Sequence, residues 1–248
     1  MKDTKSDTRR DIHNSDVPEI CRSCEARHKG VCGALNPVQL TKLAKQTTRR
    51  EITEGTELIA ADEPVASYSN IMSGVVKLSK LLADGRQQIV GLQFAPDFLG
   101  RPLKADSRIS AEAATMVKLC SFPKTTLERM MEEAPGLEHK LLEQALNELD
   151  EARDWMVTLG RKSAGEKIAS FLYLIAVHID PEVDDLTDGS CNFDLPLTRA
   201  DIADFLGLTI ETVSRQLTKL RQQNVITIIN NRHVTIPDIK LLRECCEE

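Results

Sequence analysis

Short runs of β-branched and other apolar residues, separated by turn signals, occupy the chain from about Thr47 to Phe122. This spacing is typical of short antiparallel strands. Ser73-Gly74 predicts a tight hairpin between two of the runs, and Asp84-Gly85 predicts a second turn. Together the runs predict a small antiparallel β-roll of the jelly-roll type. The expected strands are Tyr68–Met72, Val75–Leu82, Gln88–Phe94 and Met116–Phe122.

The period becomes helical after Phe122. Thr126–Glu133 predicts a short helix that ends before Pro135-Gly136, and Leu137–Arg161 predicts a long one. Apolar residues in the long helix alternate spacings of three and four, as in the a/d seam of a coiled coil. An amphipathic helix lying on its own domain is the alternative, but the narrow seam favours a parallel helix pair and a homodimer. The seam is Leu142, Ala145, Leu149, Ala152, Met156 and Leu159.

A third pattern, from Leu197 to Leu220, predicts two short helices joined by a turn. Thr198 is followed three positions later by Asp201, a variant of the capping box that starts a helix. Gly207 lies where the turn needs a residue that tolerates a left-handed backbone. Thr209 can cap the second helix. This combination predicts a helix-turn-helix.

The exposed face of the second helix suits the major groove of DNA. Arg215 can donate two hydrogen bonds to a guanine, and Glu211 can accept one from a cytosine or adenine amine. Val225–Ile229 and His233–Ile236 surround an Asn-rich turn, which predicts a wing hairpin. We expect base contacts near the start of the second helix and phosphate contacts from basic side chains around it. The expected DNA-binding residues are Glu211, Ser214, Arg215, Thr212, Lys219 and Arg199.

The formal net charge of −6 is unusual for a DNA-binding protein. Only the contacting face must be basic, however, and four Lys or Arg stand against one acid between Glu211 and His233. The chain has no run of about 18 apolar residues, and its first residues are polar. We therefore expect a cytoplasmic protein with no membrane span and no secretory signal.

Cysteines cluster near the N-terminus of a chain that we expect to stay in a reducing compartment, which indicates metal or redox chemistry. Cys21 and Cys24 close a tight turn that presents two thiolates, as zinc and iron–sulfur sites need, and Cys32 follows. A fourth ligand must come from elsewhere. Cys120 is the candidate, because strand alternation exposes it on one side of the final strand.

The other three cysteines are expected to be incidental thiols. We expect Cys191 to lie in a polar loop, at the end of the Asp-rich stretch Pro181–Ser190, and the vicinal pair Cys245-Cys246 to lie at a frayed chain end. Residues 1–20 carry no periodicity and predict a mobile tail.

Taken together, these features resemble the Crp/Fnr superfamily of bacterial transcription regulators over nearly the whole chain. The recognition-helix pattern E-x-x-S-R, here Glu211-Thr212-Val213-Ser214-Arg215, resembles its FNR branch, and Leu159–Ala169 resembles the junction before the DNA-binding domain. The resemblance implies a homodimeric activator that reads a palindrome of the type TTGAT-N4-ATCAA, with RNA polymerase as a partner. It also implies base contacts by Glu211, Ser214 and Arg215.

The cysteines resemble the FNR branch as well, in which three N-terminal cysteines and one roll cysteine hold a [4Fe–4S] cluster. The resemblance implies that Cys21, Cys24, Cys32 and Cys120 are the ligands. It further implies an oxygen sensor in which the intact cluster promotes dimerisation and DNA binding at low oxygen, and oxygen destroys the cluster. The spacing between Cys24 and Cys32 is longer than in the best-known member, so stability toward oxygen could differ.

The same fold could serve two other kinds of regulator, and an enzyme is a third alternative. A structural zinc site would use the same four thiolates. A cyclic-nucleotide receptor of this family needs a glutamate where Arg101 stands, and Arg108–Ala111 is a poor phosphate motif. The chain has no Walker loop, dinucleotide fingerprint or Ser/His/Asp constellation, so we expect no enzyme.

The expected fold class is α+β. The expected organisation is an N-terminal tail and cysteine segment (1–36), a β-roll sensor domain that resembles cyclic-nucleotide-binding domains (37–135), a dimerisation helix (137–161) and a winged helix-turn-helix domain (163–248).

Overall fold

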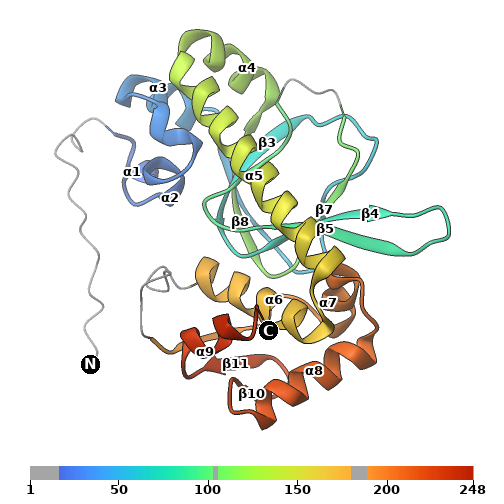
Figure 1. Ribbon diagram of the computed structural model, residues 1–248. Coiled ribbons are helices and arrows are strands. Elements are labelled where there is room, and N and C mark those ends of the chain that lie inside the picture. The colour runs from blue at the N-terminus through green and yellow to red at the C-terminus, as the bar shows by residue number, and fades with distance from the viewer. Residues whose placement is uncertain (1–16, 103–105, 180–188, 248) are drawn as a thin grey trace.

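The computed structural model describes residues 17–102, 106–179 and 189–247. Figure 1 shows a β-roll, a long helix α5 (Pro135–Arg161) that runs along it, and a C-terminal domain at the far end of that helix. Short N-terminal helices lie beside the first half of α5. Residues 1–16 of the predicted tail lie outside the described residues. For residues 17–20 the prediction of a mobile tail is wrong, because Val17 is 3% exposed and α1 begins at Glu19. The N-terminal helices are α1 (Glu19–Arg22), α2 (Glu25–His28), the 3-10 helix η2 (Val31–Ala34) and α3 (Pro37–Ala44).

The roll consists of two four-stranded antiparallel sheets. Ile71, Val76 and Leu119 are at most 1% exposed and form part of the apolar core of the roll. Since side chains alternate along a strand, Leu119 in the core leaves the next residue, Cys120, on the outer face. The first sheet has the order β1 (Thr48–Ile52), β8 (Val117–Pro123), β3 (Ser67–Ser73), β6 (Phe98–Leu99), and the second β2 (Glu57–Ile59), β7 (Ser110–Ala113), β4 (Val76–Leu81), β5 (Gln87–Gln93).

The hairpin predicted at Ser73-Gly74 is wrong. Strand β3 pairs with β8 and β6, whereas β4 pairs with β5 and β7, so the chain crosses from one sheet to the other at this turn. Gly74 has φ +90°, and a Cβ there would lie 2.3 Å from the carbonyl oxygen of Met116. The glycine is needed for this close approach. The turn at Asp84-Gly85 does close the β4–β5 hairpin, as predicted.

The two helices after the roll are close to those predicted. Helix α4 (Lys124–Glu133) starts two residues earlier than expected, and α5 starts at Pro135, which occupies its first turn. A proline is favoured there because it needs no hydrogen-bond partner for a backbone N–H. Leu137 anchors the start of α5 in the core beneath the N-terminal helices.

The C-terminal domain packs its helices around a three-stranded antiparallel sheet. Its largest buried side chains include Phe171, Leu172 and Ile175, all on one helix. The elements are α6 (Ala164–Ile179), β9 (Cys191–Asp194), α7 (Arg199–Leu206), α8 (Ile210–Gln222), β10 (Thr227–Ile229), β11 (His233–Ile236) and α9 (Ile239–Glu244). The α+β class, with a roll, a long helix and a winged helix-turn-helix, is as predicted.

Two predictions about the remaining cysteines are wrong. Cys191 is 1% exposed and begins strand β9, which pairs with β11 and adds a third strand to the wing. Most of the loop predicted before it, residues 180–188, lies outside the described residues. Cys246 is 7% exposed and packs in the core of the C-terminal domain, so the chain end is not frayed there. At both sites, packing in the apolar core of the C-terminal domain overrides the polar local sequence.

The C-terminal domain contacts the roll through the β4–β5 hairpin. Lys77 of β4 forms ion pairs with Asp201 of α7 at 2.8 Å and with Glu112 of β7 at 3.0 Å. The side-chain amide of Gln88 donates to the carbonyl oxygen of Phe205 at 3.2 Å. The ring of Phe205 also lies 4.6 Å from that of Trp155, on α5. The first helix of the helix-turn-helix thus contacts both the second sheet of the roll and α5.

Candidate metal centre and nucleic-acid interface

The N-terminal segment folds back on itself around its cysteines. Cys21 lies in α1, Cys24 is the N-cap of α2 and Cys32 lies in η2. A Cβ on Gly30 would lie 2.9 Å from the carbonyl oxygen of Pro96, which means that this glycine allows the segment to dock closely against the roll. Helix η2 also packs against α5.

Cys120 lies at the centre of the outer face of the first sheet. It pairs with Arg49 on β1 and with Asn70 on β3, so the three residues form one rung across the sheet. Directly opposite residues in antiparallel strands project from the same face. The amide nitrogen of Asn70 donates to the sulfur of Cys32 at 3.2 Å, which connects the N-terminal segment to this rung.

The four thiols are close enough to influence one another. Burial, followed by the neighbouring Cys120, Cys24 and Cys21, raises the pKa of Cys32 to about 12, although the hydrogen bond from Asn70 acts in the opposite direction. Burial likewise raises the pKa of Cys120 to about 11, again with contributions from Cys24 and Cys21. Arg49 acts in the opposite direction on Cys120 and Cys21. The four thiolates together would be strongly disfavoured without a positive centre among them.

This donor set fits an iron–sulfur cluster. Four thiolates bind either zinc or a cluster, but all the ligands of a zinc ion lie about 2.0–2.3 Å from one centre. Among residues 17–102, 106–179 and 189–247, no three Cys, His, Asp or Glu side chains converge closely enough to hold one metal ion. A cluster spreads its thiolates over several irons. The chemistry of the four thiols suits either group.

The helix-turn-helix has the caps that its sequence predicts. The backbone N–H of Asp201 donates to the hydroxyl of Thr198, and that of Thr198 donates to the Asp201 carboxylate, both at 3.1 Å. Gly207 has φ +63° at the turn. The hydroxyl of Thr209 accepts the N–H of Thr212 at 3.2 Å and caps α8. These bonds confirm the predicted capping box and second cap.

Helix α8 presents the predicted recognition residues on its outer side. Val213, Leu217 and Leu220 are buried, at most 5% exposed. Thr212 is partly buried, and its hydroxyl lies 3.4 Å from the guanidinium of Arg215. The exposed members of the predicted set are Glu211, Ser214, Arg215 and Lys219.

Arg199 differs from the other predicted DNA contacts because it is partly buried. Its guanidinium donates to the carbonyl oxygen of Asn231 in the wing turn at 3.3 Å, and burial lowers the pKa of Arg199. Its other terminal nitrogen is buried and has no hydrogen-bond partner among the described residues. Asn230 and Asn231 have φ values of +51° and +58°, typical of a tight two-residue turn. Arg199 thus supports the wing, and its phosphate contact stays a prediction.

The predicted seam of α5 lies on the surface of the single chain. Leu142, Leu149 and Met156 are 56%, 45% and 72% exposed, and Leu159 is partly buried. The two seam alanines, Ala145 and Ala152, are also exposed. The stripe is broader than the sequence indicated, because Leu146 and Val157 are more than half exposed too. An exposed apolar stripe of this length is typical of a surface that another helix covers.

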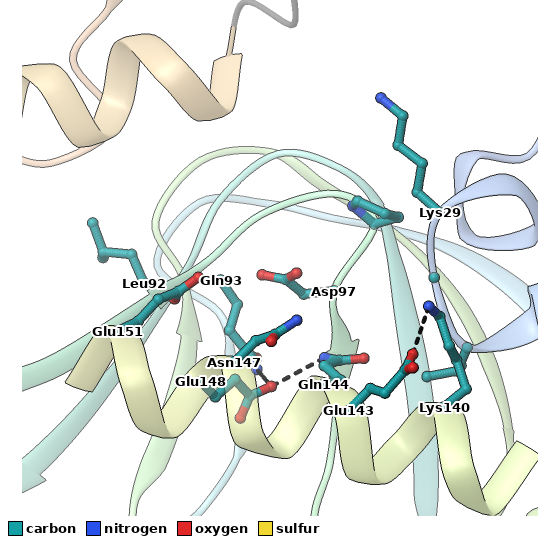
Figure 2. A pocket seen from close by; sticks show the side chains of 13 residues that line it. Lys29, Leu92, Gln93, Asp97, Lys140, Glu143, Gln144, Asn147, Glu148 and Glu151 are labelled. Atoms are coloured by element: carbon teal, nitrogen blue, oxygen red, sulfur yellow. Dashed lines mark hydrogen bonds and ion pairs between the residues drawn. The ribbon is translucent and has the colours of Figure 1, made fainter. Parts of the chain in front are cut away.

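A polar cavity of about 210 Å³ lies between α5, the roll and the N-terminal segment. Figure 2 shows Lys29 on one side, Asp97 and Gln93 from the roll, and Glu148 and other α5 side chains on the opposite side. Burial is the main cause that raises the pKa values of Asp97 and Glu148, and the same holds for Glu151. This acidic cavity was not predicted from the sequence, because its residues come from the N-terminal segment, the roll and α5.

Arg101 and Arg108 lie in the two segments whose sequence matches a cyclic-nucleotide site poorly. Arg101 and Arg108 are both exposed. A Cβ on Gly100 would lie 2.3 Å from the ring of Tyr68, and the Tyr68 hydroxyl donates to the carbonyl oxygen of Arg101 at 3.2 Å. The fully buried Tyr68 ring therefore packs directly against the backbone at Gly100.

Two family models match the chain: a cyclic nucleotide-binding domain over residues 49–134 and a Crp-like helix-turn-helix domain over residues 166–245. A probable transcriptional activator of Rhizobium leguminosarum is 55% identical over 93% of this chain and 95% of its own. The transcriptional activator protein FnrL of Cereibacter sphaeroides is 38% identical over 92% and 94%.

The solved structure of FixK2 from Bradyrhizobium japonicum matches with a TM-score of 0.71 and 30% identity, over 82% of this chain and 98% of that one. In the described part of this chain, no helix is long and apolar enough to span a membrane. The relatives of known role are transcription regulators and not enzymes. With its cyclic-nucleotide-type roll and Crp-like helix-turn-helix, this chain belongs to the Crp/Fnr family and is a transcriptional activator of that type.

Proposed function

We propose that this activator is oxygen-responsive and that Cys21, Cys24, Cys32 and Cys120 hold a [4Fe–4S] cluster. One observation supports the proposal most: Asn70, which pairs with Cys120 across the sheet, donates to the sulfur of Cys32, and Cys21, Cys24 and Cys120 are near enough to Cys32 to raise its pKa. The names of the relatives specify no cofactor, so the proposal rests on the cysteines of this chain. Bound there, the cluster supplies a redox centre that reacts with oxygen.

The residues of the N-terminal segment connect the cysteine site to α5. Lys29, Gly30 and Val31 line the same cavity as Lys140 and Glu143 of α5. Four thiolate bonds that cross-link α1, α2 and η2 to β8 would fix this wall of the cavity. The adjoining turns of α5 then keep the orientation that presents the seam to a second copy. Loss of the cross-link releases the segment and weakens the dimer.

The dimer determines how the protein reads DNA. Two α8 helices held about 34 Å apart, one turn of the double helix, engage both halves of a TTGAT-N4-ATCAA-like palindrome. Glu211, Ser214 and Arg215 contact bases, and Thr212 supports the Arg215 side chain. Lys219 and Arg199 contact phosphates, and the bound dimer contacts RNA polymerase.

We assign the cysteine segment to residues 1–36, the sensor roll to 37–135, the dimerisation helix to 137–161 and the DNA-binding domain to 163–248. Leu142, Ala145, Leu149, Ala152, Met156 and Leu159 form the seam between two copies.

Anaerobic purification followed by an absorption spectrum and iron, sulfide and zinc analysis tests the proposal. We expect a brown protein with about four irons and four sulfides per chain. Cys120→Ser should remove the colour, because it removes the ligand that comes from the roll. Cys245→Ser is the matched control, since this cysteine is partly buried at the other end of the chain, and should keep the colour. Stoichiometric zinc without sulfide would replace the proposal with a structural zinc site.

A further inference from the structure

Asn70 is the most deeply buried polar side chain beside the four cysteines. It lies on β3, in the rung with Cys120, and is 1% exposed. Its amide nitrogen donates to the sulfur of Cys32 at 3.2 Å. Its amide oxygen is also buried and has no hydrogen-bond partner in the part of the chain that the structure describes. The amide is therefore only half satisfied.

If Asn70 only filled space in the core, its half-satisfied amide would be unfavourable. An unpaired buried polar group costs about 1–3 kcal/mol, and an apolar residue of the same shape would avoid that cost. The neighbouring positions on this side of the sheet are apolar: Tyr68 and Phe122 belong to the same core cluster as Cys32. Within this apolar cluster the N–H of Asn70 is aimed at a sulfur. That geometry indicates a role in holding or tuning the sulfur.

The opposite side of the rung carries a second donor. The guanidinium of Arg49 donates to the carbonyl oxygen of Ile20, next to Cys21. Cys120 is thus flanked by a cationic side chain and by an amide donor. Both stabilise negative charge on the thiolates, but Arg49 is exposed, and water screens its effect. Asn70 is shielded from water, so its hydrogen bond should be the stronger of the two.

We propose that Asn70 is a positioning residue for the cluster: its amide N–H holds the Cys32 thiolate in place and raises the reduction potential of the cluster. This inference rests on the proposed function, because it requires a cluster on the four cysteines. The direction follows from electrostatics. A reduced cluster carries one more negative charge than an oxidised one, so a donor to a ligand sulfur stabilises the reduced form more.

The test is a redox titration of the anaerobic protein, followed by its visible and electron paramagnetic resonance spectra, together with iron content per chain. Asn70→Leu removes the donor at similar volume, and Asn70→Asp replaces it with an acceptor. We expect the midpoint potential to fall in the order wild type, Asn70→Leu, Asn70→Asp. Ser69→Ala is the matched control. Ser69 is buried on the same strand, and its hydroxyl is hydrogen-bonded to Ser121 at 2.7 Å. This variant should lose stability without a change in potential.

The outcomes separate the two claims. A wild-type protein without iron and sulfide contradicts the proposed function, and the role of Asn70 with it. A wild-type cluster with an unchanged potential in both Asn70 variants contradicts only the role of Asn70. Partial loss of iron, with the wild-type potential in the loaded fraction, would mean that Asn70 only packs. Complete loss of iron from folded Asn70→Leu, but not from Ser69→Ala, supports the positioning role. Circular dichroism establishes folding, and the two Asn70 variants differ enough for one to remain measurable if the other unfolds.

Discussion

At the scale of single residues, the carboxylate of Asp97 lies in surroundings that disfavour its charge. It lines the cavity of Figure 2 together with Glu148 and Glu151. It accepts a hydrogen bond from the backbone N–H of Phe94 at 2.8 Å, but burial outweighs this bond and raises the pKa of Asp97. The folded protein therefore holds the proton of Asp97 to a higher pH than the unfolded chain does. Its ionised carboxylate costs stability near neutral pH.

Asp97→Asn should raise the melting temperature at pH 7 by a few degrees, because the amide still accepts from Phe94 and carries no charge. The stability that a raised pKa contributes is fully present below the ordinary value of 3.8 and is lost as pH rises through the raised value. The gain of the variant should therefore shrink as pH is lowered toward 3.8. Asp84→Asn is the control of opposite sign, because Arg86 lowers the pKa of Asp84. A melting temperature that falls equally at every pH would contradict this account.

The recognition helix allows a second prediction for single residues. Arg215→Ala should cost about 1–3 kcal/mol at one base pair of each half-site and relax the preference there. Lys219→Ala, one turn further along α8, should weaken binding to every sequence alike and reduce the salt slope by about one unit. Binding titrations against the palindrome and its single-base variants measure both. Equal losses at all sequences for Arg215→Ala would show that Arg215 contacts phosphate.

The exposed residues of the recognition helix and the buried polar residues of the roll differ in how well the sequence predicts them. Glu211 and Arg215 could be read directly, because the period of one helix separates its buried face from its exposed face. Asn70 and Asp97 could not, because their environment depends on partners far along the chain. Asn70 shares its short run with the polar residues Ser67 and Ser69, so its polarity gives no signal on its own. Only the register that pairs it with Cys120 gives it a role.

At the scale of whole elements, α5 carries an apolar stripe that the single chain leaves uncovered. The stripe follows the predicted a/d spacing and adds Leu146 and Val157 beside it. Two of the six predicted seam residues are alanines, which bury little area, and acidic side chains flank them. Such a helix pair should be only moderately stable. It would therefore be sensitive to changes in the segment that packs against α5.

Leu149→Glu should convert the dimer to a monomer even with the cluster bound, because it would bury a charge in the seam. Val38→Glu is the matched control. Val38 is 68% exposed on α3, away from the stripe, and this variant should stay dimeric. Sedimentation velocity under anaerobic conditions distinguishes the two states. Dimers of Leu149→Glu would place the interface elsewhere.

Helices were predicted more accurately than strand pairing. The Thr209 cap of α8 and the end of α5 at Arg161 are as predicted, and the start of α5 differs by two residues, because such local signals act within a few residues. The Ser73-Gly74 turn has an equally clear local signal, yet it joins two sheets instead of two paired strands. Which strands pair depends on contacts distant in sequence, and a turn signal carries no information about them.

At the scale of the whole molecule, the DNA-binding domain is coupled to the sensor roll through Lys77. Burial alone would lower the pKa of Lys77, but its bonds to Asp201 and Glu112 outweigh burial and raise it. For Asp201, burial favours a higher pKa, and the bonds from Lys77 and Thr198 lower it instead. Asp201 also belongs to the capping box of α7. One carboxylate therefore serves both the start of the helix-turn-helix and its contact with the roll.

Lys77→Met should destabilise the protein by about 2 kcal/mol near neutral pH, because two partly buried carboxylates lose their partner. Lys80→Met, on the exposed part of the same strand, should change stability by less than about 0.5 kcal/mol. Because folding lowers the pKa of Asp201, its carboxylate stabilises the folded protein at pH values above the ordinary 3.8. This stabilisation is lost as the pH falls through the lowered pKa. The difference between the two variants should accordingly narrow below pH 3.8 in thermal melts. Equal stability of the two variants at pH 7 would show that the ion pairs of Lys77 do not stabilise the protein.

The order of domains was predictable from the sequence, whereas their contacts were not. Roll, long helix and winged helix-turn-helix each have a periodicity of their own. The contact between Lys77 and Asp201 joins residues 124 positions apart and has no signal in either segment. The same holds for the way η2 packs against α5, on which the proposed coupling depends.

The most direct test of the central claim is a DNA-binding titration on one anaerobic sample before and after exposure to air. The target is the TTGAT-N4-ATCAA palindrome at fixed salt, and Cys120→Ser is measured in parallel. A shift of about 2–3 kcal/mol in dimer free energy corresponds to roughly 30- to 140-fold in the equilibrium constant. We therefore predict that affinity falls at least tenfold in air, and that Cys120→Ser binds weakly in both conditions. Equal affinity of the wild-type protein before and after air, matched by Cys120→Ser, would contradict the account.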